Sequence, residues 1–179
     1  TKQYSSYVDH ALRSLGYKTM HQIMDMSEFG VPQDRKRFIL VAMRDYFPKD
    51  VFDTLERNKD AFCLSKGISC TTSIKDAIGD LEQAKGSMPS PDTKGFMAGV
   101  YGPEQSGYQH LMRSGLKTTG LIADSHRFVN HRKNTIELHK ELLDKAPVGK
   151  RITPRDNIVE NLNRRGVTVL NANAQAPTI

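Results

Sequence analysis

The sequence predicts an α/β fold in which the last strands of a layered sheet are followed by a smaller mixed α+β region. Residues 1–44 have the order helix, strand, turn, strand, which is typical of the end of an α/β domain. After Arg44 the pattern changes, because the apolar runs become short and a long stretch is rich in Gly, Pro and Ser. We therefore expect two units, residues 1–45 and residues 46–179.

The composition is that of a globular chain. With 179 residues, of which 37% are apolar, it is long enough to bury a core without disulfide support. Its mean hydropathy is −0.54, and its longest apolar run, residues 38–43, is far shorter than the roughly 20 residues that cross a bilayer. No basic and apolar leader opens the sequence, and its two cysteines are too few for a disulfide scaffold. We expect a protein of the reducing cytoplasm, with no membrane partner.

The first unit has clear signals for each element. Residues 3–15 carry apolar side chains at the i, i+3, i+4 spacing of a helix face, and Gly16 is placed to end that helix. Residues 17–26 contain no Gly or Pro and predict an extended strand. A turn at residues 29–32 follows. Residues 36–44 are almost continuously apolar with a β-branched centre, which predicts a buried strand.

The second unit is less regular. Residues 45–72 show no clear period and predict irregular structure, whereas Ser73 and Asp76 have the spacing of a capping box and predict the start of a short helix. Residues 84–107 predict a long loop. The remaining expected elements are a short helix at residues 108–112, helices over residues 134–144 and 155–163, and a closing strand over residues 167–170.

Positive charge is concentrated in one segment. The formal net charge is +6, and residues 126–165 alone hold ten basic and five acidic side chains. A localised excess of this kind, in a chain with a pI near 9.3, is typical of proteins that bind polyanions. On charge alone, a solvated basic surface without a partner remains the alternative.

The residues with the clearest chemical implication precede the second strand. In an extended chain Gln33, Arg35 and Arg37 point to one face, and Asp34 and Lys36 point to the other. An amide and two guanidiniums are costly to leave unpaired at the mouth of a buried strand, so the pattern favours binding of a planar, acceptor-rich group or a phosphate. An edge strand with solvated charges is the alternative.

This segment resembles a known family. Gly-Val-Pro-Gln-Asp-Arg-Lys-Arg, residues 30–37, followed by an apolar strand resembles the Gln-x-Arg-x-Arg signature of the DNA cytosine-5 methyltransferases. Four further segments are similar to that family in matching order: Leu15-Gly16-Tyr17, Asp-Ala-Ile-x-Asp-Leu at residues 76–81, the Tyr…Ser-x-Tyr-Gln-x-x-Met-Arg pattern at residues 101–113, and Ala176-Pro177-Thr178-Ile179. The resemblance covers almost the whole chain.

The resemblance implies a fold and an activity for the parent protein. Residues 1–45 would be the tail of the catalytic domain, with the last strands of its Rossmann-like sheet, and residues 46–179 would be the target-recognition domain. The parent would methylate C5 of a cytosine flipped out of double-stranded DNA, in a prokaryotic restriction-modification or related system. In the family a cysteine thiolate adds to cytosine C6, a glutamate holds N3, and S-adenosylmethionine supplies the methyl group.

The resemblance also implies roles for individual residues. Arg37 would reach the flipped cytosine with Arg35 beside it, and Gln33 would support the pocket edge and the adjacent DNA. Together with the charge pattern, it implies further contacts to DNA bases or phosphates, some of them from loops at residues 84–107 and 113–120. The residues expected to make these further contacts are Arg113, Lys117, Thr118, Thr119, Arg127, Arg132 and Lys133.

Several family motifs have no counterpart in these 179 residues. The glycine loop for the methyl donor, the Pro-Cys nucleophile and the Glu-Asn-Val motif are absent, and neither Cys63 nor Cys70 follows a proline. We therefore expect both cysteines to be structural, and the chain to be a fragment that is inactive alone and binds no S-adenosylmethionine. His126, His131 and His139 have no close thiolate or carboxylate set, so no metal site is expected.

Two other hypotheses stay open at this level. The chain could be a natural subunit of a split methyltransferase, with the rest of the enzyme on a partner. It could also be a non-catalytic module that binds nucleic acid.

Overall fold

The computed structural model describes residues 2–116 and 122–178. Its α-helices are α1 (Lys2–Ser14), α2 (Pro48–Ser65), α3 (Ile74–Ile78), α4 (Gly107–Arg113) and α5 (Lys133–Lys145). Its strands are β1 (Lys18–Asp25), β2 (Lys36–Met43), β3 (Ser87–Pro89), β4 (Met97–Val100), β5 (Ile122–Arg127), β6 (Arg151–Ile152) and β7 (Val167–Thr168). Short 3-10 turns are η1 (Met26–Phe29), η2 (Gly79–Leu81), η3 (Gln83–Lys85) and η4 (Pro154–Asp156).

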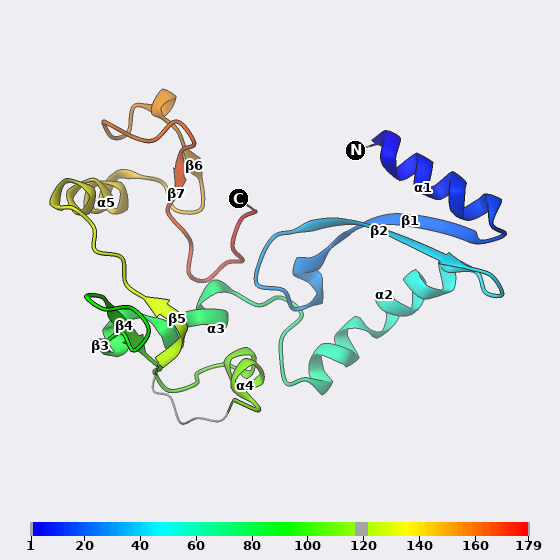
Figure 1. Ribbon diagram of the computed structural model, residues 1–179, viewed down its shortest axis with the longest axis horizontal. Helices are drawn as coiled ribbons and strands as arrows, with labels where there is room; N and C mark the ends of the chain where they lie inside the picture. Colours follow the sequence, from blue (N-terminus) through cyan, green and yellow to red (C-terminus); the bar gives the residue numbers. More distant parts are fainter. Residues whose placement is uncertain (1, 117–121, 179) are drawn as a thin grey trace.

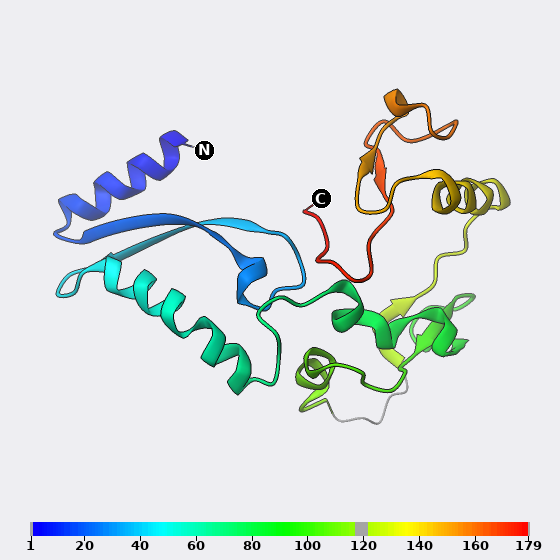
Figure 2. The ribbon, with the colours of Figure 1, turned by 180° about the vertical axis from the view of Figure 1, so that it is seen from behind.

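These elements form two groups (Figures 1 and 2). In the first group α1 and α2 lie along opposite sides of the β1–β2 hairpin, and in the second α3, α4 and α5 surround small sheets. The C-terminal segment runs back between the two groups. Within the described residues, no helix is long and apolar enough to cross a membrane.

The first group follows the predictions for residues 1–44 in most respects. Gly16 ends α1 with a left-handed φ of +84°, and the N–H of Tyr17 donates to the carbonyl of Leu12 at 3.1 Å. This is the hydrogen bond of a Schellman cap, and it confirms the predicted helix end. β1 and β2 pair antiparallel along their full length, from Lys18 opposite Met43 to Asp25 opposite Lys36.

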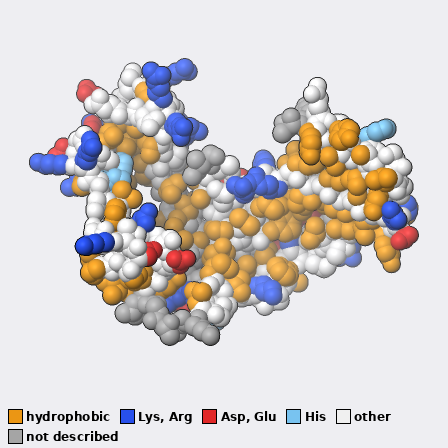
Figure 3. Space-filling model, in the orientation of Figure 1, with side chains coloured by type: hydrophobic (Ala, Val, Ile, Leu, Met, Phe, Trp, Pro, Cys, Tyr) orange, Lys and Arg blue, Asp and Glu red, His pale blue; other side chains and the backbone are white. Residues whose placement is uncertain are grey.

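The prediction that the second strand is buried is wrong. β2 is only half-buried, and Phe38 keeps 48% of its surface exposed. The reason is that, among the described residues, β1 is the single strand paired along β2, so the hairpin has open apolar surface. Figure 3 shows hydrophobic side chains spread over this part of the molecule.

The first group also contains a helix that was not predicted. Residues 45–72 are not irregular, since α2 occupies most of them with Pro48 at its first turn. Only Pro48, Phe52 and Cys63 of this helix are buried, so its apolar period is too sparse to recognise.

The predicted loop at residues 84–107 is also partly wrong. It includes β3 and β4, which form a three-stranded antiparallel sheet with β5. β3 and β4 are only three and four residues long, and β4 also pairs with β5, which lies more than twenty residues further along the chain.

In the C-terminal part, one predicted helix is confirmed and the prediction of another is wrong. α5 agrees with the prediction for residues 134–144, and α3 and α4 agree with the two short helices. The helix predicted over residues 155–163 is only the turn η4, because Asn157 and Asn161 adopt left-handed backbone with φ of 50° and 59°. The predicted closing strand is shortened to β7, which pairs with β6.

One buried cluster stabilises this end of the chain. It consists of Leu142, Ala146, Ile152 and Val159. Apolar residues from α5, β7 and the turns between them pack against it. The molecule is therefore a mixed α/β structure with small sheets, as predicted at the coarse level, and every strand pair described is antiparallel.

Candidate functional site

The Gln33–Arg37 segment has the alternation that its sequence predicts. Gln33, Arg35 and Arg37 are half-buried, whereas Asp34 and Lys36 between them are exposed. Alternate residues of an extended segment share a face, so the amide and both guanidiniums lie on the more protected side. Nη1 of Arg35 donates to Oε1 of Gln33 at 3.3 Å, which brings two of the three groups into direct contact.

No carboxylate of the described residues neutralises either guanidinium. Among the described residues, Arg35 and Arg37 take part in no ion pair. Arg37 donates from Nη1 to the carbonyl of Lys36 at 3.1 Å. Each guanidinium has five N–H donors, so most of the donors on this face are left for a bound group.

The turn before this segment is held firmly. Asp25 caps η1, accepting from the N–H of Ser27 at 3.1 Å and from its hydroxyl at 2.6 Å. These hydrogen bonds lower the pKa of Asp25 below its ordinary value, with the Ser27 hydroxyl as the largest cause. The N–H of Met26 donates to the carbonyl of Arg35 at 3.0 Å. The cap and this bond attach the backbone of Arg35 to η1.

Gly30 fits the turn that leads to the site. Its φ is +82°, and a Cβ there would lie 2.9 Å from Cδ1 of Ile68. Its N–H donates to the carbonyl of Cys70 at 2.8 Å. The left-handed backbone therefore favours glycine here, whereas the contact with the end of the Ile68 side chain would need only a small shift of that side chain.

Arg113, expected to contact DNA, is engaged inside the protein. Its guanidinium lies 3.2 Å from Asp80 and 3.3 Å from Glu104, and it donates to the carbonyl of Gly102 at 2.9 Å. It also lies over the ring of Tyr101, with the carbon of the guanidinium 4.3 Å from the ring centroid. Asp80 is 3% exposed, so Arg113 balances a buried charge and ties α4 to η2.

The other expected DNA-contacting residues differ in their exposure and contacts. Arg127 donates to Oγ1 of Thr93 at 2.9 Å and lies over the ring of Phe96. Arg132 and Lys133 are exposed at the start of α5 and form no ion pair within the described part of the chain. Lys117, Thr118 and Thr119 lie outside the described residues.

The structure does not bring all the predicted residues together. Gln33, Arg35 and Arg37 belong to the first group of elements, and the remaining candidates belong to the second (Figure 1). Lys and Arg side chains also gather over the end of the molecule that holds α5, β6 and β7 (Figure 3).

The two cysteines lack the properties of nucleophiles. Cys63 is buried, and the Cys70 thiol donates to the carbonyl of Lys59 at 3.5 Å. A hydrogen bond with Cys63, then burial and a hydrogen bond with Asp60, raise the pKa of Cys70 to about 12. A thiol with such a pKa stays protonated near neutral pH, in agreement with the structural role predicted for both residues.

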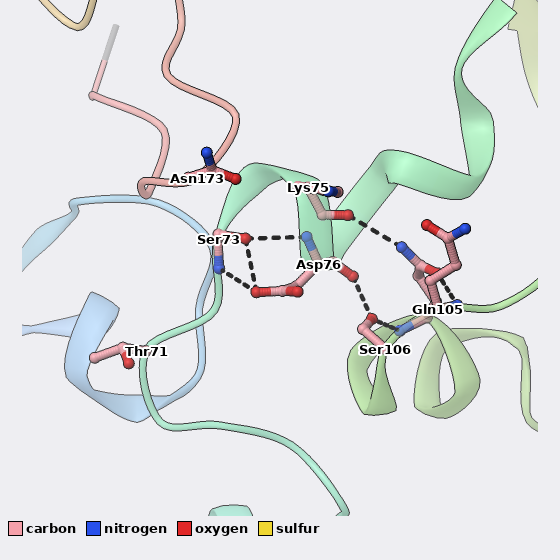
Figure 4. A pocket seen from close by; sticks show the side chains of 8 residues that line it. Thr71, Ser73, Lys75, Asp76, Gln105, Ser106 and Asn173 are labelled. Atoms are coloured by element: carbon pink, nitrogen blue, oxygen red, sulfur yellow. Dashed lines mark hydrogen bonds between the residues drawn. The ribbon is translucent and has the colours of Figure 1, made fainter. Parts of the chain in front are cut away.

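Two hollows of the described residues differ in their linings. One, of about 530 Å³, lies between α3, α4 and the C-terminal segment (Figure 4). Its walls are polar, formed by Thr71, Ser73, Lys75, Asp76, Gln105, Ser106, Gln109 and Asn173. An adenine ring needs an apolar slot, which these side chains do not provide. A second hollow, along α5, has both carboxylates and apolar side chains on its wall, among them Glu137, Glu141, Glu160, Leu138, Ile158 and Leu162. No group of three potential metal ligands occurs within residues 2–116 and 122–178.

Sequence reasoning missed one part of this site. The C-terminal residues were noted only for their resemblance, yet they lie directly against Gln33, which forms an isolated parallel bridge with Ala176. Their one sequence signal is the Ala-Pro-Thr-Ile ending, which carries no indication of where in the fold it packs.

Comparison with known proteins identifies the class. Residues 3–165 match the family described as C-5 cytosine-specific DNA methylase, and because this is most of the chain, the protein belongs to that family. It is 38% identical over 66 residues to a type II methyltransferase, M.MspI, of a Moraxella species. That match covers 31% of this chain and 16% of the relative, so the chain spans only a small part of that protein's length. No solved structure matches the chain significantly.

Proposed function

We propose that this chain is the part of a DNA cytosine-5 methyltransferase that supplies the Gln33–Arg37 face to the target-base pocket and recognises the DNA around it. The complete enzyme methylates C5 of a flipped cytosine with S-adenosylmethionine. The observation that carries the proposal is the match to the family over residues 3–165, combined with two guanidiniums on one protected face that no carboxylate of the described residues neutralises.

The chemistry needs groups of this kind. A cytosine swung out of the duplex loses its stacking and pairing partners, so the pocket must replace those interactions with hydrogen bonds. Guanidinium donors fixed on a strand give their greatest stabilisation where negative charge develops on the ring during the reaction. In this proposal Arg37 contacts the base, Arg35 lies beside it, and Gln33 holds Arg35 through the 3.3 Å hydrogen bond.

The second group would position the DNA. Arg132 and Lys133 stand at the N-terminus of α5, where the first turn has no acidic residue. A helix N-terminus attracts anions through its unpaired N–H groups and its dipole, and two adjacent cations strengthen that attraction. We assign these two residues to the DNA backbone and Arg127 to a neighbouring phosphate, whereas the internal contacts of Arg113 favour a structural role for that residue.

The remaining catalytic parts would come from other segments. Because the glycine loop and the Pro-Cys and Glu-Asn-Val motifs have no counterpart in these residues, we propose no step in which this chain holds the methyl donor. The exposed apolar surface of the β1–β2 hairpin, including Ile23 at 72% exposure, supports coverage by the rest of a larger catalytic domain. That domain would be residues of the same parent chain or a partner subunit, working in the cytoplasm on nucleoid DNA in a restriction-modification or related system.

Two measurements on the isolated chain test the proposal. It should bind double-stranded DNA with an affinity that falls steeply as salt rises, and calorimetry should detect no binding of S-adenosylmethionine. Binding of S-adenosylmethionine by the isolated chain would contradict the proposal that other segments of the enzyme hold the methyl donor. Failure to bind DNA at low salt would contradict the recognition role.

The gene around the chain separates the alternatives. A Pro-Cys and a Glu-Asn-Val motif encoded in frame before residue 1 indicate one parent enzyme, and the same motifs in a neighbouring gene indicate a split enzyme. If neither occurs, a non-catalytic nucleic-acid-binding module accounts for the chain better.

A further inference from the structure

The C-terminal residues 172–178, here called the strap, contact both groups of elements at residues that are distant from the strap in sequence. In Figures 1 and 2 the strap passes between the first group and α3. Its contacts fall into two sets, one at the Gln33 segment and one at the start of α3.

The first set fixes the backbone around Gln33. The N–H of Asp34 donates to the carbonyl of Ala176 at 2.8 Å, and the N–H of Ala176 donates to the carbonyl of Pro32 at 3.0 Å. The hydroxyl of Thr178 donates to the carbonyl of Asp34. The strap therefore forms an isolated parallel bridge with Gln33 through Ala176, and three backbone groups on either side of Gln33 are held in place.

A side-chain contact reaches further into the site. Nε2 of Gln175 donates to the carbonyl of Ser27 at 2.7 Å, and Ser27 is a buried residue of η1. Since the N–H of Met26 in η1 bonds the carbonyl of Arg35, Gln175 connects the strap to the turn that holds Arg35.

The second set fixes the other end of the strap. The N–H of Ile74 donates to the carbonyl of Ala174 at 2.9 Å, and the N–H of Lys75 donates to the carbonyl of Ala172 at 2.8 Å. These two N–H groups in the first turn of α3 have no partner within the helix, so the strap satisfies them. Figure 4 shows Asn173 of the strap beside Ser73 and Lys75.

We propose that the strap is a positioning element for the Arg35–Gln33 pair, and that Gln175 is a positioning residue for the methyl-transfer reaction. The Gln175–Ser27 hydrogen bond holds the strap against η1. The strap and η1 in turn hold the backbone that carries Gln33 and Arg35. Displacing reacting or stabilising groups by about 1 Å can cost on the order of a hundredfold in rate, so a contact this far from the base affects turnover. The inference rests on the proposed function of Arg35.

A double-mutant cycle in the complete methyltransferase tests the proposal. Gln175→Met keeps the length of the side chain and removes its donor. We expect it to lower kcat about tenfold in the wild-type background and less than about twofold in the Arg35→Ala background, because a residue that acts through Arg35 has nothing to position once Arg35 is gone. KM for DNA should stay within about twofold.

The cycle distinguishes failure of this inference from failure of the proposed function. Asn173→Ala, an exposed position in the same strap, is the matched control and should leave kcat unchanged. Equal losses from Gln175→Met in both backgrounds, or no loss in either, would overturn the positioning role. A full-activity Arg35→Ala enzyme would instead overturn the proposed function.

Hydrogen exchange on the 179-residue chain gives a second measurement that needs no activity. Gln175→Met should accelerate exchange of the Asp34 and Ala176 amides at least about fivefold, while the amides of the β1–β2 ladder keep their protection. Unchanged exchange at Asp34 and Ala176 would contradict the coupling between Gln175 and the Gln33 segment.

Discussion

Arg35 and Arg37 contrast with Arg113 in what their guanidiniums contact. Arg113 is paired with Asp80 and Glu104, and removing it would leave a buried carboxylate without a partner. Arg35 contacts an amide and Arg37 a backbone carbonyl, so neither has its charge balanced by the described residues. The family match covers all three, but their contacts differ: those of Arg113 stabilise the fold, whereas we propose that Arg35 and Arg37 face a bound base.

The thiol of Cys70 gives a test of the structural role of the cysteines. With its pKa raised to about 12 by Cys63, burial and Asp60, Cys70 has little thiolate at pH 8. We expect alkylation by iodoacetamide at pH 8 to be at least about a hundredfold slower than for a free cysteine. Mass spectrometry of the modified peptides measures the rate, and a rate close to that of free cysteine would contradict the environment described.

The cap of η1 makes stability depend on pH. The pKa of Asp25 is lowered from 3.8 in the folded protein, so its stabilising effect is complete above the unfolded value and is lost as the pH falls through the folded one. We expect the melting temperature of the wild type to drop more steeply from pH 5 to pH 3 than that of Asp25→Asn, which keeps an acceptor but cannot titrate. If calorimetry shows that the melting temperatures of the two proteins fall equally between pH 5 and pH 3, Asp25 is not a source of the acid sensitivity.

At the scale of elements, α4 is attached to α3 by a buried amide. Gln109 is 2% exposed, accepts from the N–H of Gln105 at 2.7 Å and donates to the carbonyl of Lys75 at 3.1 Å. Gln109→Leu would leave the N–H of Gln105 and the carbonyl of Lys75 without this partner. We therefore expect a loss of about 1–3 kcal/mol in the free energy of unfolding. Chemical denaturation measures it.

Gln105 provides the matched control for that measurement. Its side chain is exposed, and Gln105→Ala keeps the backbone N–H that Gln109 accepts from, so stability should change by less than about 0.5 kcal/mol. If both variants cost the same, the buried network is not what attaches α4.

The elements that the sequence predicts well are those with local signals. α1 has a complete apolar face and a glycine cap, and α3 has its capping box from Ser73 and Asp76. β3 and β4 could not be predicted, because their own patterns are only a few residues long and the pairing of β4 with β5 is a tertiary contact.

Two other differences have specific physical reasons. α2 is a mostly exposed helix with only three buried residues, so its sequence shows no clear apolar period. The helix expected over residues 155–163 fails because Asn157 and Asn161 adopt left-handed backbone, which asparagine tolerates and a helix excludes.

The candidate site could be predicted only in part. The alternation of Gln33, Arg35 and Arg37 follows from the period of an extended chain, and the burial pattern agrees with it. The contact of Gln175 with Ser27, 148 residues away in sequence, has no local signal. The internal pairing of Arg113 also depends on residues from η2 and the segment before α4, so the sequence could not separate it from the exposed arginines.

At the scale of the whole molecule, the charge distribution predicts how DNA binding responds to salt. Arg132 and Lys133 are exposed and unpaired within the described residues, whereas Lys145 lies 2.6 Å from Glu141. Replacing Arg132 and Lys133 together by Gln should reduce the slope of log affinity against log salt by about two, since each phosphate contact contributes roughly 0.9. Lys145→Gln should leave the slope nearly unchanged. Equal slopes for all three proteins, measured by fluorescence anisotropy, would contradict the assignment of the phosphate contacts to α5.

The most direct test of the central claim compares turnover with DNA binding for Arg37→Ala in the complete methyltransferase. If the Gln33–Arg37 face serves the flipped cytosine, kcat for methyl transfer should fall by about a hundredfold or more while Kd for DNA changes by less than about threefold. A loss of DNA affinity as large as the loss of turnover would contradict a role at the target base and would make Arg37 one more contact to the DNA backbone.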